Sequence, residues 1–175
     1  IGSRAFYYCT SLTSITIPDK VKSVGDYVFY ECSNLTTITI PDSVTNIGEH
    51  AFYSCSSLTS ITIPDNVTSL DRYLFAHCDS LTTITIPASI TSVDITAFSS
   101  CDRLTAIDVN TNNKYFASED GVLFDKTKKI LLLYPMGKTS QTYVIPDSVI
   151  KIGGCAFEYC KGLTSITIPD SVTSI

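Results

Sequence analysis

The sequence has little positive charge, and its basic residues do not gather in one place. Lys and Arg number 12 against 17 Asp and Glu, the formal net charge is -5 at pH 7, and the longest basic run is Lys128-Lys129. A nucleic-acid backbone or an anionic membrane surface is bound through clustered Lys and Arg. The composition therefore argues against nucleic acid as a partner.

Long hydrophobic runs and an N-terminal targeting pattern are also missing. No apolar stretch approaches the roughly 18 residues of a membrane-spanning helix. The chain begins at Ile1 without an initiator Met, and no signal pattern follows. We therefore expect no membrane insertion by these residues.

Histidine is scarce, and the motifs that carry catalysis or bind metals are absent. The two histidines, His50 and His77, lie at variable positions between predicted core residues. His77 adjoins Cys78, but neighbouring residues at a surface and a core position point apart, which argues against a catalytic dyad. There is no glycine-rich phosphate loop, zinc-ligand spacing or nucleophile elbow. The sequence predicts a protein that is not an enzyme and needs no cofactor or metal.

What the sequence does contain is a repeat of 23 residues. The stretch LTTITIPDSVTNIGEHAFYSCSS, residues 35–57, recurs nearly unchanged from Leu12, Leu58 and Leu81, and it begins again at Leu104 and Leu163. A period in this range is typical of a solenoid, in which each unit buries its apolar side chains only against its neighbours. We expect a single solenoid domain over residues 1–175.

Each unit is predicted to supply one strand, two corners and one helical turn. Pro18 ends the strand, because proline cannot donate to a strand ladder. Strands of successive coils would then form a parallel sheet with about 4.8 Å between neighbours. The positions of the first full unit that should face the core are Leu12, Ile15, Ile17, Val21, Val24, Val28, Phe29 and Cys32.

Six of the seven cysteines share one position in the unit, which argues against disulfides and favours small apolar core residues. Cys155 alone lies elsewhere, at the variable position before Ala156, where it is either a reactive surface thiol or a tolerated substitution. The cysteines in core phase are Cys9, Cys32, Cys55, Cys78, Cys101 and Cys160.

One interruption divides the chain. Cys101 and Cys160 are 59 residues apart rather than 23, so 36 residues have been added. Segments 121–125 and 129–134 flank a Lys-Thr-Lys turn and predict a β-hairpin. The hairpin either packs its leucines, Leu123, Leu131 and Leu133, over the solenoid or projects its basic tip as a contact site. The resulting divisions are regular repeats at 1–103, a repeat with the inserted hairpin at 104–146, and regular repeats at 147–175. The basic residues of the tip are Lys126, Lys128 and Lys129.

Two further rows of residues are candidate binding surfaces. Threonines that face outward from the strands either form a hydroxyl-rich surface for a protein or glycan, or simply suit an exposed strand. Tyrosines that follow the core Phe either anchor a partner or cover the edge of the helical turn. The two rows are Thr16, Thr39, Thr62 and Thr85, and Tyr7, Tyr30 and Tyr53.

The pattern L-x-x-I-x-I-P-x-x-V-x-x-I-x-x-x-A-F-x-x-C resembles the BspA-like, treponemal-type leucine-rich repeat over the whole chain. The resemblance implies an α/β solenoid, a right-handed superhelix with a parallel sheet on one face and short helical turns on the other. It also implies a place on the cell surface or in secreted protein, with adhesion to host or extracellular-matrix proteins. The alternative is a structural spacer that presents another domain and binds nothing itself.

The two ends of the chain are in the same phase of the repeat. Ile1-Gly2 matches Ile47-Gly48, and Ile175 falls at the same position of the unit. Solenoids need terminal units with a polar outer face, and neither end departs from the consensus. We expect a fragment of a longer array, with head-to-tail self-association through uncapped ends.

Overall fold

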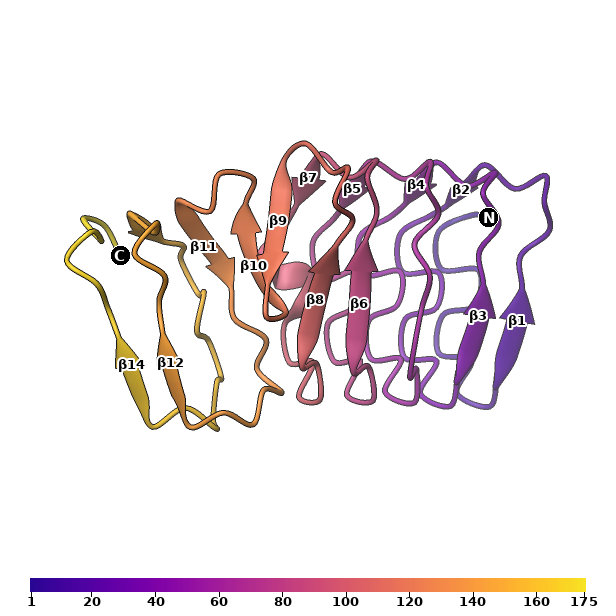
Figure 1. Cartoon of the computed structure of the whole chain (residues 1–175). Helices are drawn as coiled ribbons and strands as arrows, with labels where there is room; N and C mark the ends of the chain where they lie inside the picture. The colour runs from indigo at the N-terminus through magenta and orange to yellow at the C-terminus, as the bar shows by residue number, and fades with distance from the viewer.

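The computed structural model describes all residues, Ile1 to Ile175. It is a β-solenoid of about seven coils stacked along one axis, with the termini at opposite ends (Figure 1). Each coil is one turn of the chain around that axis. The predicted repeat architecture is confirmed.

The strands predicted at the start of each unit line one side of the stack. They pair in parallel two at a time, as β1 with β3, β6 with β8 and β12 with β14, rather than as one continuous sheet. Equivalent residues lie opposite each other, for example Ile15 and Ile38. The strands are β1 (Ser14–Thr16), β3 (Thr37–Thr39), β6 (Thr83–Ile86), β8 (Ala106–Val109), β12 (Thr142–Val144) and β14 (Ser165–Thr167).

The third coil breaks this sheet, which corrects the expectation of an uninterrupted ladder. Residues 60–62 form no strand, and no backbone hydrogen bond joins residues 59–63 to the coil on either side. Ile61 and Ile63 are nevertheless buried. The inward side chains hold this segment in place by packing, without the ladder.

A second, shorter set of strands lies near the first corner of each coil. β2 pairs in parallel with β4, and β5 pairs with β7. The predicted inward positions Val24 and Ile47 are buried there. The strands are β2 (Ser23–Val24), β4 (Asn46–Ile47), β5 (Ser69–Leu70), β7 (Ser92–Val93) and β13 (Lys151–Ile152).

The predicted helical turns are wrong as helices, so the fold is β rather than α/β. The only helical element is one short 3-10 helix, η1 (Ile95–Phe98). In other coils this segment contains residues with positive φ, such as Tyr27 (57°) and Glu31 (59°), which no α-helix accommodates. Its amides bond to the next coil instead, as when Phe29 N–H donates to the Ala51 carbonyl at 2.8 Å. The apolar residues spaced three and four apart therefore belong to a turn whose amides hydrogen-bond to the next coil.

The added residues build three strands between the regular coils (Figure 1). These are β9 (Phe116–Glu119), β10 (Val122–Asp125) and β11 (Ile130–Leu133). β10 pairs antiparallel with both β9 and β11, and β11 pairs in parallel with β13. The turn between β9 and β10 lies against β8, where Ile107 N–H donates to the Gly121 carbonyl at 2.9 Å. Gly121 has φ +73°, and a Cβ there would come within 2.7 Å of the Ala106 Cβ.

Most of the 36 added residues are one further coil. Tyr134 is buried and lies 36 residues after Phe98 but only 23 before Phe157. Its N–H donates to the Ala156 carbonyl at 2.8 Å, as Phe75 N–H does to the Ala97 carbonyl. Tyr134 therefore occupies the core Phe position, and the true excess over the repeat is 13 residues.

The strands of the insertion separate two hydrophobic cores. The larger core contains 31 buried residues and the smaller contains 8. Leu123 of β10 belongs to the larger core, whereas its neighbours Val122 and Phe124 belong to the smaller. β10 and β11 are thus a layer within the stack, with side chains alternating between the cores.

Candidate functional site

A shallow groove lined by aromatic rings lies on the turn side of the first four coils, and we call it the aromatic trough. It has a volume of about 430 Å³. The predicted residues Tyr7, Tyr30 and Tyr53 form one side. The residues that line the trough are Tyr7, Tyr27, Tyr30, His50, Tyr53 and Tyr73.

The rings of the trough stack along the solenoid axis in two columns. In the first, ring centroids are 5.0 Å apart for Tyr7 and Tyr30, and 4.7 Å apart for Tyr30 and Tyr53, with planes 14° and 3° from parallel. In the second, Tyr27 stacks on His50 at 4.6 Å and 10°. Stacked rings cover each other's faces, so the columns present ring edges and polar atoms to a ligand.

A stack of phenylalanines beneath the surface sets this arrangement. Phe6, Phe29 and Phe52 stack at 5.3 and 5.4 Å, and the stack continues to Phe75 and Phe98. Each tyrosine of the first column directly follows one of the first three. The core therefore spaces the surface rings by one coil, and the trough inherits the regularity of the repeat.

Partial burial shifts the ionisation of the trough. It raises the pKa of Tyr30 and Tyr53, and nearby charges, including the Glu31 carboxylate, act in the same direction. Burial lowers the pKa of His50, whose Nδ1 is buried without a hydrogen-bond partner. Burial thus disfavours the charged form of Tyr30, Tyr53 and His50.

Arginines lie at both ends of the trough. The Arg4 guanidinium is 5.3 Å from the Tyr27 ring centroid and 5.8 Å from that of Tyr7, and the Arg72 guanidinium is 5.8 Å from that of Tyr73. These distances are typical of cation–π contacts.

The second column could have been found from the sequence. Arg4, Tyr27, His50 and Tyr73 occupy the same position of successive units. The sequence gives this shared position, but it does not give the stacking of the His50 ring between two tyrosines. The structure stacks this ring at 4.6 Å from Tyr27 and 5.0 Å from Tyr73.

The predicted threonine row is exposed but discontinuous. Thr16 and Thr39 lie opposite each other across β1 and β3, and Thr85 lies opposite Asp108. Thr62 falls in the break of the third coil. The hydroxyls of this row make no hydrogen bond within the chain, in contrast to that of Thr36, which donates to the Thr13 carbonyl at 3.0 Å. Thr62 and Thr85 both line an open hollow of about 210 Å³, together with Asp65 and Asn110, whereas Thr16 and Thr39 lie outside it.

The predicted lysine tip is largely engaged within the chain. Lys128 forms a salt bridge to Glu119 at 2.7 Å. Lys126 Nζ donates to the Thr111 carbonyl at 3.3 Å. Of the three lysines, only Lys129 is exposed with no hydrogen-bond partner for its ammonium group. The tip presents less free positive charge than its sequence indicates.

All seven cysteines are free, and those in the middle of the core-phase row are fully buried. The Cys55 thiol donates to the Phe29 carbonyl, and the Cys78 thiol to the Phe52 carbonyl, each at 3.2 Å. Burial raises the pKa of Cys32 to about 11 and that of Cys101 to about 12. The predicted structural role of these thiols is confirmed.

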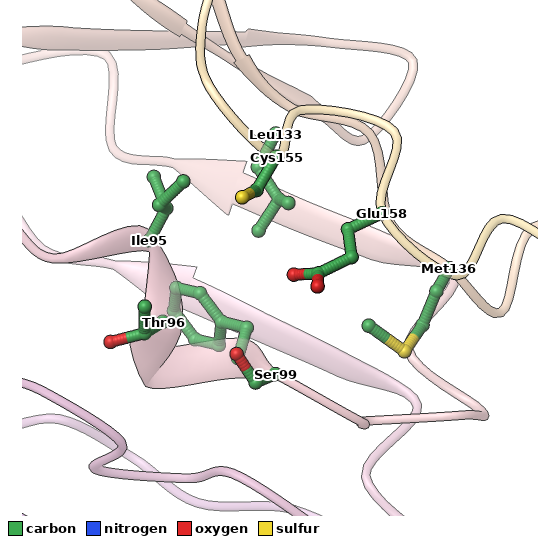
Figure 2. A pocket seen from close by; sticks show the side chains of 8 residues that line it. Ile95, Thr96, Ser99, Leu133, Met136, Cys155 and Glu158 are labelled. Atoms are coloured by element: carbon green, nitrogen blue, oxygen red, sulfur yellow. The ribbon is translucent and has the colours of Figure 1, made fainter.

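Cys155 is exposed and lines a small hollow between η1 and the last coils (Figure 2). Leu133, Met136 and Glu158 also line this hollow. Its volume of about 20 Å³ leaves room for a single water molecule.

No group of three or more His, Cys, Asp and Glu side chains is placed to hold a metal ion, and no helix is long and apolar enough to cross a membrane.

Solved structures with a similar fold include bacterial leucine-rich repeat proteins. One from Eubacterium ventriosum superposes with a TM-score of 0.78 at 28% identity, over 93% of this chain and 49% of the other. The pneumococcal vaccine antigen PcpA gives 0.78 at 26% identity, over 91% and 51%. A leucine-rich cell surface protein from Faecalibacterium prausnitzii gives 0.59 at 33% identity, over 100% and 60%. The chain thus spans about half the length of the first two.

No curated protein matches the chain. The model of the BspA type leucine-rich repeat region, in contrast, matches it in six copies over residues 1–129 and 136–175. Together with the repeat and the solenoid, this match shows that the chain belongs to the BspA-type leucine-rich repeat family.

Proposed function

We propose that this chain is a noncatalytic protein-binding repeat domain of a bacterial cell-surface protein, with adhesion to host or extracellular-matrix proteins as its role. Leucine-rich repeat solenoids are typically scaffolds for protein interaction rather than enzymes. Its structural relatives include a cell surface protein and a vaccine antigen. The cell-surface location rests on that resemblance.

The aromatic trough is the observation that carries this proposal. Tyr30 and Tyr53 remain partly exposed although neighbouring Phe29 and Phe52 already fill the core. Tyrosine is enriched at the centres of protein interfaces, because it combines a large apolar ring with a hydrogen-bonding hydroxyl. The threonine row and the lysine tip are the other two candidate surfaces.

A screen of the whole chain against immobilised matrix proteins tests the proposal. Three variants assign the surface: Tyr53→Leu for the trough, Thr39→Arg with Thr62→Arg for the sheet side, and Lys129→Glu for the tip. We expect saturable binding that Tyr53→Leu weakens by about tenfold and the other changes leave intact. Loss through either other variant moves the site to that surface.

The spacer hypothesis is the second candidate, and the regular stacking of the coils favours it. A spacer would bind no matrix protein in the same screen.

Self-association of the chain through its ends stays a prediction, and light scattering over a concentration series measures it. A mass that stays monomeric at the highest concentration would contradict it.

A further inference from the structure

We propose that the aromatic trough binds a basic, proline-rich segment in the polyproline II conformation, laid along the solenoid axis. This inference rests on the proposed function and names the chemistry of the partner. Four properties of the trough support it: the ring spacing, the absence of free backbone groups, the covered ring faces and the nearby carboxylates.

The spacing of the rings matches the pitch of a polyproline II helix. The separations of Tyr7 from Tyr30 and of Tyr30 from Tyr53 are 5.0 and 4.7 Å. Two steps therefore cover about 10 Å, close to the ~9.3 Å of one three-residue turn of polyproline II. Every second coil would meet an equivalent face of the ligand, so the contacts repeat in register.

The backbone beneath the trough has no free edge for an added β-strand. Tyr27 N–H donates to the Glu49 carbonyl at 2.9 Å, and Glu31 N–H donates to the Tyr53 carbonyl at 2.8 Å. A partner must therefore be recognised by rings and hydroxyls, which is how proline-rich chains bind aromatic grooves. The tyrosine hydroxyls of the trough donate to no group within the chain. Polyproline II has no internal hydrogen bonds, so its carbonyls are free to accept from them.

The stacking of the rings argues against a glycan as the ligand. A sugar packs its C–H groups on an open aromatic face. The faces of Tyr30 are covered on both sides by Tyr7 and Tyr53, and His50 lies between Tyr27 and Tyr73. The covered faces also limit stacking by proline, so a peptide would be held by ring edges and by hydroxyls that donate to its carbonyls.

The charges beside the middle of the trough favour a basic ligand. Glu31 and Glu49 lie in the second and third coils, and neither forms a salt bridge. The arginines at the two ends already contact rings of the trough. Lys or Arg residues that alternate with proline would meet unpaired carboxylates at the centre, on a chain of net charge -5.

A labelled peptide titrated with the whole chain tests the inference by fluorescence anisotropy. The probe is a peptide of about nine residues built from Pro-Pro-Lys triplets, enough to span the trough at ~3.1 Å per residue. Its control replaces each proline with glycine, which keeps the charge but removes the preformed conformation. We expect the proline peptide to bind at least about tenfold more tightly than the glycine peptide.

Three variants place the site. Tyr53→Leu is expected to weaken binding by about tenfold, and Tyr30→Phe, which removes only a hydroxyl, by about threefold. Tyr115→Leu is the matched control, because Tyr115 is 52% exposed but lies on the insertion. It should leave binding unchanged. Circular dichroism verifies that each variant keeps its fold.

The outcomes separate this inference from the proposed function. Equal binding of the two peptides, no peptide binding, or an equal loss in Tyr115→Leu would overturn it. If matrix proteins bind through the trough while the proline peptide does not, the protein-binding function stands and only the ligand class is wrong. If neither binds, both proposals fail and the spacer hypothesis is favoured.

Discussion

The regular coils and the insertion solve the same packing problem in different ways. In the regular coils Leu, Ile, Phe and Cys recur at fixed inward positions, and the Phe stack repeats at 5.3 to 6.1 Å. In the insertion no such repeat exists, and β10 sends Leu123 to one core and Phe124 to the other. A coil can therefore take in extra residues when these form their own strands and the chain regains its inward phase, here at Tyr134.

Asn113 marks the point at which the chain leaves the repeat. It lies 23 residues after Ile90 and is the only buried polar residue, at 1% exposure. Its Nδ2 donates to the carbonyls of Pro87 and Ile90, both at 2.9 Å, and its Oδ1 accepts from the amides of Tyr115 and Phe116. The side chain thus joins the last regular coil to the start of the insertion.

Truncating one buried Phe in each region tests whether the insertion is packed as tightly as the regular coils. Phe75→Ala and Phe124→Ala should each lower the free energy of unfolding by about 3–5 kcal/mol, because both side chains are fully buried. Urea denaturation followed by circular dichroism measures the loss, with Tyr115→Ala as the exposed control. A cost below about 1 kcal/mol for Phe124→Ala would mean that the insertion merely lies over the solenoid.

Restoring the consensus at Asn113 tests whether its polar contacts are needed. Asn113→Val introduces the residue type of the regular coils, yet it should destabilise the chain by about 2–3 kcal/mol. The amides of Tyr115 and Phe116 would lose their acceptor in a buried setting. Ile90→Val, at the same position one coil earlier, is the control and should cost about 1 kcal/mol. If Asn113→Val leaves the free energy of unfolding unchanged, the chain needs no buried polar contact at the point where it leaves the repeat.

A smaller loss is expected when one buried thiol is removed. Cys78→Ala should cost about 1–2 kcal/mol, because it empties a small buried volume and removes the bond to the Phe52 carbonyl. Cys155→Ala is the matched control and should be neutral, since Cys155 is exposed. Thermal unfolding of both variants measures the difference. Equal melting temperatures would show that the cysteine position tolerates any small residue.

The sequence predicts the core positions that recur in every coil, but it does not predict structural features that occur only once. The inward positions of the regular coils follow from the period, so Phe29, Cys55 and Leu81 are buried as expected. Apolar residues three and four positions apart occur both in a helix and in a turn that hydrogen-bonds to the next coil. The prediction of helical turns was wrong for this reason. The roles of Tyr134 and Asn113 were not predicted, because their positions in the repeat become clear only when the structure shows where the 13 extra residues lie.

The candidate surfaces were predictable only as rows of residues. The period places Tyr7, Tyr30 and Tyr53 on one line, but it does not give the stacking of their rings or the partnership with His50. The positive charge of the basic tip was overestimated, because Lys128, in the turn between β10 and β11, forms a salt bridge to Glu119 at the end of β9. Salt bridges of this kind depend on the geometry of the turn that joins β9 to β10, and the sequence does not give that geometry.

The smallest expected effect concerns a difference within the regular coils themselves. Residues 59–63 make no backbone hydrogen bond to either neighbouring coil, whereas Ile17 N–H, in the equivalent segment of the first coil, donates to the Thr39 carbonyl at 3.1 Å. Amides without such bonds exchange with solvent through small local fluctuations. We expect amides 60–62 to exchange at least about tenfold faster than amides 37–39 and 83–85 in hydrogen–deuterium exchange. Equal rates would mean that the sheet is continuous in solution and that the side chains of Ile61 and Ile63 are not what holds the third coil. If the difference is observed, the stack is held there by its core alone, and the ladder is a local reinforcement that single coils can lose.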